Sequence, residues 1–309
     1  VRKGFRPVYW DTYFHTALAE AEIEYENHVS DSIYVKFPLI DPQTVPGLSD
    51  MDKVSLVIWT TTPWTLPANL AVCLHPDFDY DVIQAGDEFY IVANQLAQDF
   101  IKACGLEHHA ALATRVEARD LERRWCRHPI FEGKRSLVVL GAHVTADQGT
   151  GCVHTAPGHG VDDFLIGKAY GLPVFVPVDA TGRFTADYPQ MQGVQVFEAN
   201  PRIIQKLKEA GLLLAHGKIE HQYPHSWRSH QPIIFRATEQ WFMELDEGQV
   251  RERALEAIRN DVQWIPTWGQ ERIFSMVQGR PDWCLSRQRA WGVPIPAIRN
   301  KTTGKSILN

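Results

Sequence analysis

The chain has 309 residues and a formal net charge of −6, with 44% hydrophobic and 22% charged residues. This composition is typical of a globular protein, and the length allows one large domain or two ordinary ones. No uninterrupted apolar run approaches the roughly 18 residues needed to span a bilayer, so we expect no membrane association. The negative charge argues mildly against a protein that coats nucleic acid nonspecifically, because phosphate binding needs clustered Lys and Arg.

Five cysteines are widely scattered along the chain, at Cys73, Cys104, Cys126, Cys152 and Cys284. Their odd number and the lack of a Cys-x-x-Cys pair argue against a disulfide framework and against a structural zinc site. We therefore expect reduced thiols in a cytoplasmic protein. Because the sequence starts at a valine and ends without an obvious final element, we also expect an excised piece of a longer protein.

Short strands are predicted throughout the first half of the chain. Strict alternation of glutamates with other residues over 19–26 predicts one strand. Other short runs separated by Pro, Gly and Asp clusters predict strands at 32–39, 54–59, 89–93, 137–140, 152–155 and 174–178. Many short strands favour a closed or barrel-like sheet.

Helices are predicted at 94–104, 162–170, 200–210 and 248–260. The third of these has Asn200 and Pro201 at its start and Gly211 just beyond its end, which are the residues that helix ends favour. The mixture indicates an α+β fold, dominated by strands up to about residue 178 and more helical after residue 200.

Arginines cluster within residues 115–127, with Lys134 and Arg135 just beyond. The favoured interpretation is a solvated helix face on which Glu117 and Glu122 balance the arginines. A local phosphate-binding patch is the alternative.

The stretch GTGCVHTAPGHGVDD (149–163) is rich in glycine, histidine and aspartate. Its glycines permit close approach of a ligand to the backbone. The positive end of the helix that follows favours ionised carboxylates at Asp162 and Asp163, although the two lie about 100° apart around the helix and cannot face one pocket.

Three interpretations of this stretch compete. His154, His159 and an aspartate offer ligand types that suit a divalent metal, although His-x4-His across a Pro-Gly loop is not a recurrent spacing. The carboxylates can instead simply cap a helix, which the sequence alone favours. The third interpretation is a ligand pocket in which one carboxylate pairs with a cationic group.

A second unusual stretch, WTTTPWTLPAN (59–69), leaves a predicted buried strand through three hydroxyl side chains and two prolines. The hydroxyls can bind a polar ligand at the mouth of the strand, while Pro63 and Pro67 stiffen the exit and Asn69 bonds loop backbone. A β-branched strand end followed by a proline turn is the alternative.

Four motifs together resemble isoleucyl-tRNA synthetase, in the same order along the chain. They are residues 59–69 and 149–163, then PIIFRAT (232–238) with QWF (240–242), and DWCLSRQRAWGVP (282–294). The sibling synthetases for valine and leucine typically carry Arg in the threonine segment where this chain has Thr62, which favours the isoleucine enzyme. The resemblance spans most of the chain.

The resemblance implies the hydrolytic editing domain that interrupts the nucleotide-binding fold of these synthetases. The family's ATP-handling motifs, His-Ile-Gly-His and Lys-Met-Ser-Lys-Ser, are missing. We therefore expect no amino-acid activation here, no cofactor or metal for editing, and a need for ATP and Mg²⁺ only in the full-length enzyme. The implied regions are an N-terminal connecting β-ribbon (1–30), a β-barrel-like editing domain with peripheral helices (31–225), and a connecting segment with the start of the second half of the synthetic domain (226–309).

The resemblance also implies roles for individual residues. Asp163 would pair with the α-ammonium of valine esterified to tRNA(Ile), and His154 would act as a steric wall that excludes isoleucine. A packing role for His154 is the alternative. Thr60, Thr61 and Thr62 would hold the terminal adenosine and orient the attacking water. The remaining expected substrate-binding residues are Trp59, Asn69, Thr155, Gly158 and His159.

The expected partners are the acceptor end of tRNA(Ile) carrying valine and the rest of the synthetase, and we expect the fragment to be monomeric. In the intact enzyme Trp283, Arg287, Gln288, Arg289 and Trp291 would face the synthetic site. Three alternatives to ester hydrolysis are kept: hydrolysis of valyl-adenylate before transfer, an inert binding module for the acceptor end, and a metal hydrolase.

Overall fold

The computed structural model describes residues 1–280, 282–288 and 292–308, and the chain divides into two compact units. One unit is Pro7–Ala237, and the other combines Val1–Arg6 with Thr238–Asn309. The fold is α+β, as predicted. Among the described residues, no helix combines the length and apolar character needed to cross a membrane.

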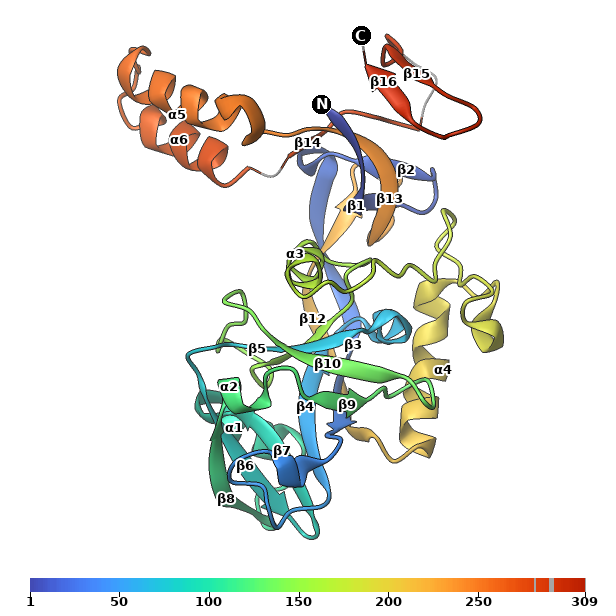
Figure 1. Ribbon diagram of the computed structural model, residues 1–309, viewed down its shortest axis with the longest axis vertical. Helices are drawn as coiled ribbons and strands as arrows, with labels where there is room; N and C mark the ends of the chain where they lie inside the picture. The colour runs from blue at the N-terminus through green and yellow to red at the C-terminus, as the bar shows by residue number, and fades with distance from the viewer. Residues whose placement is uncertain (281, 289–291, 309) are drawn as a thin grey trace. The chain divides into compact units, whose positions relative to one another are not determined.

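The larger sheet of the Pro7–Ala237 unit has six strands in the order β12-β3-β4-β7-β6-β8 (Figure 1). The long strand β3 (Ile23–Pro38) pairs antiparallel with β12 (Leu213–Ser226) and with β4 (Val54–Thr60). Strand β4 is parallel to β7 (Glu88–Ala93), and β6 (Asp79–Ala85) pairs antiparallel with β7 and β8 (Ala110–Glu117).

The second sheet of this unit has the order β11-β5-β10-β9. Strand β5 (Ala71–Leu74) lies between β11 (Cys152–Thr155), which is antiparallel to it, and β10 (Arg135–Leu140), which is parallel. Strand β9 (Trp125–Arg127) closes the row beside β10. The 3₁₀ helix η3 (Pro63–Ala68) connects β4 of the first sheet to β5 of the second. The threonine-rich segment therefore lies at the junction of the two sheets.

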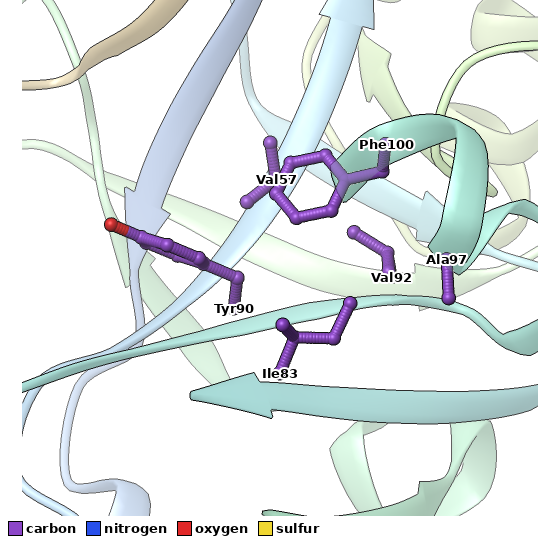
Figure 2. Packing of buried hydrophobic residues seen from close by; sticks show 6 residues of the cluster. All are labelled: Val57, Ile83, Tyr90, Val92, Ala97 and Phe100. Atoms are coloured by element: carbon purple, nitrogen blue, oxygen red, sulfur yellow. The ribbon is translucent and has the colours of Figure 1, made fainter. Parts of the chain in front are cut away.

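Two apolar clusters stabilise the sheets. The first packs residues of β4, β6 and β7 against α1 (Ala97–Ala103), as Figure 2 shows for Val57, Ile83, Tyr90, Val92, Ala97 and Phe100. The second gathers Ala71, Cys73, Leu137, Val139 and Val144. Each fully buried side chain of the larger apolar types contributes roughly 1.5–3 kcal/mol, so these clusters hold the two sheets rigid beneath the loops that connect them.

The remaining elements of this unit are short, apart from α4. They are η1 (Glu20–Glu22), η2 (Pro42–Thr44), η4 (Asn94–Leu96), α2 (Ala118–Leu121), α3 (Val161–Ala169), η5 (Pro189–Met191), α4 (Val196–Glu209) and β2 (Thr16–Leu18). Strand β2 pairs antiparallel with β1 (Arg2–Asp11), whose first residues belong to the other unit.

The unit formed by Val1–Arg6 and Thr238–Asn309 has a helical hairpin of α5 (Val250–Asn260), which follows η6 (Glu247–Gln249), and α6 (Gly269–Gln278). Its strands include the end of β13 (Ile234–Met243), which pairs with β14 (Trp283–Cys284), and the hairpin of β15 (Ala297–Arg299) and β16 (Ser306–Leu308). The three functional regions expected from the resemblance stay a prediction.

Strands β4, β7, β10 and β11 and helices α1, α3 and α5 confirm the sequence predictions to within a few residues. The strand predicted at 19–26 is wrong in its first half, because the Glu22 carboxylate accepts the Ala19 N–H and closes the turn η1. The strand predicted at 174–178 is also wrong, since only an isolated bridge joins Val178 to Phe184 there.

The helix predicted from Asn200 begins earlier, at Val196, and Pro201 lies inside it. The Gln195 side chain supplies the N-cap by accepting the N–H groups of Phe197 and Glu198. Asn200 is not a cap, because its Oδ1 accepts the N–H of Trp64 from η3 at 3.0 Å.

The arginine-rich segment is not the helix face that was expected. It forms the end of β8, the four residues of α2 and then β9, and Arg115 pairs with Asp81 across the sheet at 2.8 Å. The barrel-like sheet is not confirmed either, because the strand orders in the described part of the chain are open rows.

Candidate functional site

A cavity of about 150 Å³ in the Pro7–Ala237 unit joins the two unusual stretches of the sequence. It is lined by Trp59, Thr60, Thr62, Thr65, Val153, His154, His159 and Asp163. Pairing of β5 with β11 causes this meeting, since the chain that leaves η3 enters β5 and sets Val72 beside His154. Six of the ten site residues expected from the sequence therefore line one cavity, despite their separation in the chain: Trp59, Thr60, Thr62, His154, His159 and Asp163.

The threonine hydroxyls of the cavity form one connected row. Thr60 Oγ1 lies 3.2 Å from Thr62 Oγ1 and accepts the Thr62 N–H at 3.1 Å. Thr65 donates its hydroxyl to the Thr62 carbonyl at 2.8 Å, since residues three apart are eclipsed in a 3₁₀ helix. Thr61 is half-buried and is not among the lining residues.

Trp59 forms one side of the cavity and is fixed at both edges. Its indole N–H donates to Ser32 Oγ at 2.8 Å. Gly149 packs against the ring with φ +85°, and a Cβ there would lie 3.2 Å from the indole. A side chain at position 149 would therefore meet both backbone strain and the tryptophan.

His154 is buried and hydrogen-bonded at both ring nitrogens. Nε2 lies 2.9 Å from Thr65 Oγ1, and Nδ1 lies 2.8 Å from Asn69 Nδ2. Burial, with smaller effects from His128 and His159, lowers the pKa of His154 to about 3. The ring is therefore neutral at physiological pH and is an uncharged part of the cavity wall.

Three of the expected binding residues lie behind the wall and do not line the cavity. Asn69 is buried and holds the Ala71 carbonyl and His154. Thr155 is buried and donates to the Val153 carbonyl. A Cβ at Gly158 would come within 2.3 Å of the Phe175 carbonyl oxygen, so this glycine permits a close backbone approach.

His159 does line the cavity, and its ring proton is on Nδ1 rather than on Nε2. Its Nδ1 lies 2.8 Å from the Phe235 carbonyl, which can only accept a hydrogen bond. Burial lowers the pKa of His159 to about 4, so this ring is also neutral at physiological pH.

Asp163 lies in the first turn of α3 and is the acidic residue of the cavity. Its Oδ2 accepts the Ala156 N–H at 2.8 Å. Burial nevertheless raises its pKa to about 6, and the charge of Asp162 adds to the rise. Desolvation therefore opposes the ionised form that the helix terminus was expected to favour, but with a pKa of about 6 the Asp163 carboxylate is still mostly ionised at pH 7. Asp162 is exposed, which agrees with the expectation that the two aspartates do not face one pocket.

The metal interpretation gains no support from the chemistry of these donors. Both ring nitrogens of His154 are already engaged by Thr65 and Asn69, so neither is free to ligate an ion. In the described parts of the chain, the group with three ligand atoms within 4.8 Å of one another is Glu24, Glu26 and His230, which is exposed and does not line the cavity.

Comparison with known proteins decides the family. The model for "tRNA synthetases class I (I, L, M and V)" matches residues 1–309. The chain belongs to this family. It is 52% identical over 308 residues to an isoleucine–tRNA ligase of Desulforamulus reducens, which covers 100% of the chain and 32% of the relative. It is 49% identical over 309 residues to that of Petrotoga mobilis, again 100% of the chain and 32% of the relative.

The chain spans about a third of the length of these relatives. The resemblance to isoleucyl-tRNA synthetase is therefore confirmed at the level of sequence. A solved structure described as "The crystal structure of GlLeuRS-CP1" aligns with a TM-score of 0.48 and 17% identity, over 60% of this chain and 99% of that one.

Two residues that line the cavity, Thr65 and Val153, were missed from the sequence. Thr65 carried a usable signal, because it follows Thr62 by three residues beside two prolines. Residues three apart lie on the same side of a 3₁₀ turn, so Thr65 could have been placed next to Thr62. Val153 carried none, because its place depends on how β11 pairs. Of the residues expected to face the synthetic site, Trp283 is half-exposed in β14, and Arg289 and Trp291 lie outside the described residues.

Proposed function

We propose that this part of the synthetase removes valine from tRNA(Ile) by hydrolysing the ester bond at the 3′ end. The observation that carries the proposal is one small cavity that contains an acidic residue, Asp163, and a row of threonine hydroxyls. An aminoacyl ester has an α-ammonium, a small side chain and ribose hydroxyls, and this lining is complementary to all three.

The ammonium group is the natural partner of Asp163. Burial raises the pKa of Asp163 to about 6 because it destabilises the ionised carboxylate, and a cation beside the carboxylate would offset that cost. The ion pair would hold the ester at the cavity and would discriminate against acyl groups that lack the amine.

Cavity size supports valine as the group that is accepted. A cavity of about 150 Å³ matches engineered protein cavities that hold a molecule as large as benzene, which is larger than an isopropyl side chain. As is known for isoleucine enzymes, one methylene changes the binding free energy in a hydrophobic pocket by only about 1–3 kcal/mol. A second cavity walled by His154 can exclude the longer side chain by steric clash.

Direct attack by water is the mechanism that these residues support. Neutral His154 has both nitrogens bonded to protein groups, so it does not act as the general base. Thr60 and Thr62 offer hydroxyls that would orient the ribose and the attacking water beside the ester carbonyl. The ester is already activated, so a covalent intermediate is unnecessary.

Positive charge near the cavity strands supports a nucleic-acid partner. Arg127 of β9 and Arg135 of β10 are exposed cross-strand neighbours, and like charges placed opposite each other are destabilising unless an anion is bound. Lys134 Nζ and Lys206 Nζ lie 4.3 and 6.0 Å from the centroid of the Phe131 ring. Cations beside aromatic rings are typical of surfaces that bind single-stranded nucleic acid, such as a tRNA 3′ end.

The direct test is single-turnover deacylation of valyl-tRNA(Ile) by the chain, with isoleucyl-tRNA(Ile) as the matched substrate. We expect fast release of valine, slow release of isoleucine, and loss of the valine reaction in Asp163→Asn. Hydrolysis of valyl-adenylate without any attack on valyl-tRNA would show that the ester assignment is wrong.

A further inference from the structure

The amide of Asn69 has a defined orientation in the interior of the Pro7–Ala237 unit. Asn69 is only 2% exposed, and its Nδ2 lies 2.7 Å from the Ala71 carbonyl oxygen. Because a carbonyl oxygen only accepts hydrogen bonds, this atom must be the NH₂ group. On the other side, Ser136 donates its hydroxyl to Asn69 Oδ1 at 2.5 Å.

This orientation determines the tautomer of His154. The second N–H of the Asn69 amide points to His154 Nδ1 at 2.8 Å, so Nδ1 must be an unprotonated acceptor. The ring proton is then on Nε2, which donates to Thr65 Oγ1 at 2.9 Å. The Thr65 hydroxyl in turn donates a hydrogen bond to the Thr62 carbonyl oxygen at 2.8 Å. The hydrogen-bond chain begins and ends at backbone carbonyls, whose roles are fixed.

The sheet order explains why a fully buried serine belongs to this chain of hydrogen bonds. Strand β5, which follows Asn69, lies between β10 with Ser136 and β11 with His154. Ser136 is 0% exposed, and a buried hydroxyl in a sheet requires a partner. Its partner is the Asn69 amide, which contacts His154 of the cavity wall.

We propose that Ser136 and Asn69 are positioning residues that fix His154 in its Nε2–H tautomer, so that the wall of the cavity is rigid and offers no basic nitrogen. The consequence for specificity rests on the proposed function: a wall held in this way excludes the longer isoleucyl side chain. The tautomer itself is independent of any activity, because it follows from the hydrogen bonds alone.

The first test is ¹⁵N NMR of the histidine rings in the intact, unmodified chain. We expect His154 to give the neutral Nε2–H pattern and to show no titration between pH 5 and 8. Asn69→Asp keeps the size of the side chain but replaces the NH₂ with an acceptor, so Nδ1 must then carry a proton. We expect His154 to become protonated at neutral pH in this variant, and the valyl ester to bind with a higher KM because the cavity gains a positive charge.

The second test is the ratio of kcat/KM for valyl-tRNA to that for isoleucyl-tRNA in Ser136→Ala. We expect the ratio to fall roughly tenfold, mainly through faster hydrolysis of the isoleucyl ester, since about this much selectivity comes from one methylene. Ser55→Ala is the matched control, because Ser55 is another buried serine in a strand and does not line the cavity. We expect the control to keep the parent ratio.

An Nδ1–H pattern for His154 in the unmodified chain, or a ring that titrates between pH 5 and 8, would overturn the inference. So would an unchanged selectivity ratio in a folded Ser136→Ala. If the unmodified chain hydrolyses neither ester, the proposed function fails, and the NMR result alone still decides the tautomer.

Discussion

Replacing Asp163 with Asn removes a buried negative charge, so we expect the variant to be more stable than the parent chain even though it loses deacylation. Burial raises the pKa of this carboxyl from an ordinary 3.8 to about 6. The folded chain therefore binds the proton more tightly than the unfolded chain. The contribution of this carboxyl to the free energy of unfolding is highest below about pH 4, falls as the pH rises to about 6, and does not fall further above that pH.

The size of the effect follows from the shift. About two pKa units correspond to roughly 3 kcal/mol at pH 8, which is an upper limit because part of the carboxylate remains exposed to water. Asn keeps an oxygen that can accept the Ala156 N–H, so little else is lost. The expected gain is therefore up to roughly 3 kcal/mol at pH 8 and near zero at pH 4.

Urea denaturation of the parent chain and of Asp163→Asn at pH 4, 6 and 8 measures this difference. Asp162→Asn is the matched control, since Asp162 is the exposed neighbour on the same helix, and we expect it to change the stability little. A variant at position 163 that is less stable than the parent at pH 8, or a difference that does not depend on pH, would refute the reasoning.

Four other changes have definite expected outcomes. The kcat/KM for valyl-tRNA is expected to fall about tenfold between pH 7 and pH 5 as Asp163 is protonated, and a pH–rate profile that stays flat would contradict this. His154→Ala enlarges the cavity and is expected to permit hydrolysis of isoleucyl-tRNA, measured as release of labelled isoleucine. Gly158→Ala places a Cβ within 2.3 Å of a backbone oxygen. We expect the free energy of unfolding, measured by thermal or urea denaturation, to fall by roughly 2 kcal/mol or more. Arg127→Gln is expected to weaken tRNA binding and to reduce the slope of its salt dependence by about one, measured by filter binding.

Elements with strong local patterns could be predicted from the sequence. The buried run before Trp59 is β4, and the glycine-rich stretch does contain β11 and the start of α3. Both segments that line the cavity were recognised because hydroxyls, prolines, glycines and carboxylates are unusual at strand ends. Their meeting in one cavity was a hypothesis that only the sheet pairing could test, and β5 supplies it.

Features that depend on long-range contacts could not be predicted. Asn200 resembles an N-cap in sequence, but it bonds Trp64 across the fold while Gln195 caps the helix. The pKa of Asp163 depends on how deeply the first turn of α3 is buried, which no local pattern reveals. Ser136 carried no signal at all, because its importance arises from the order of β10, β5 and β11 in the sheet.

The most direct test of the central claim is a crystal structure of the chain with a nonhydrolysable valyl-adenosine analogue. We expect the ammonium of the analogue within about 3 Å of the Asp163 carboxylate, its isopropyl group against His154 and its ribose beside Thr60 and Thr62. An analogue bound outside this cavity, or bound inside it with the ammonium turned away from Asp163, would contradict the account.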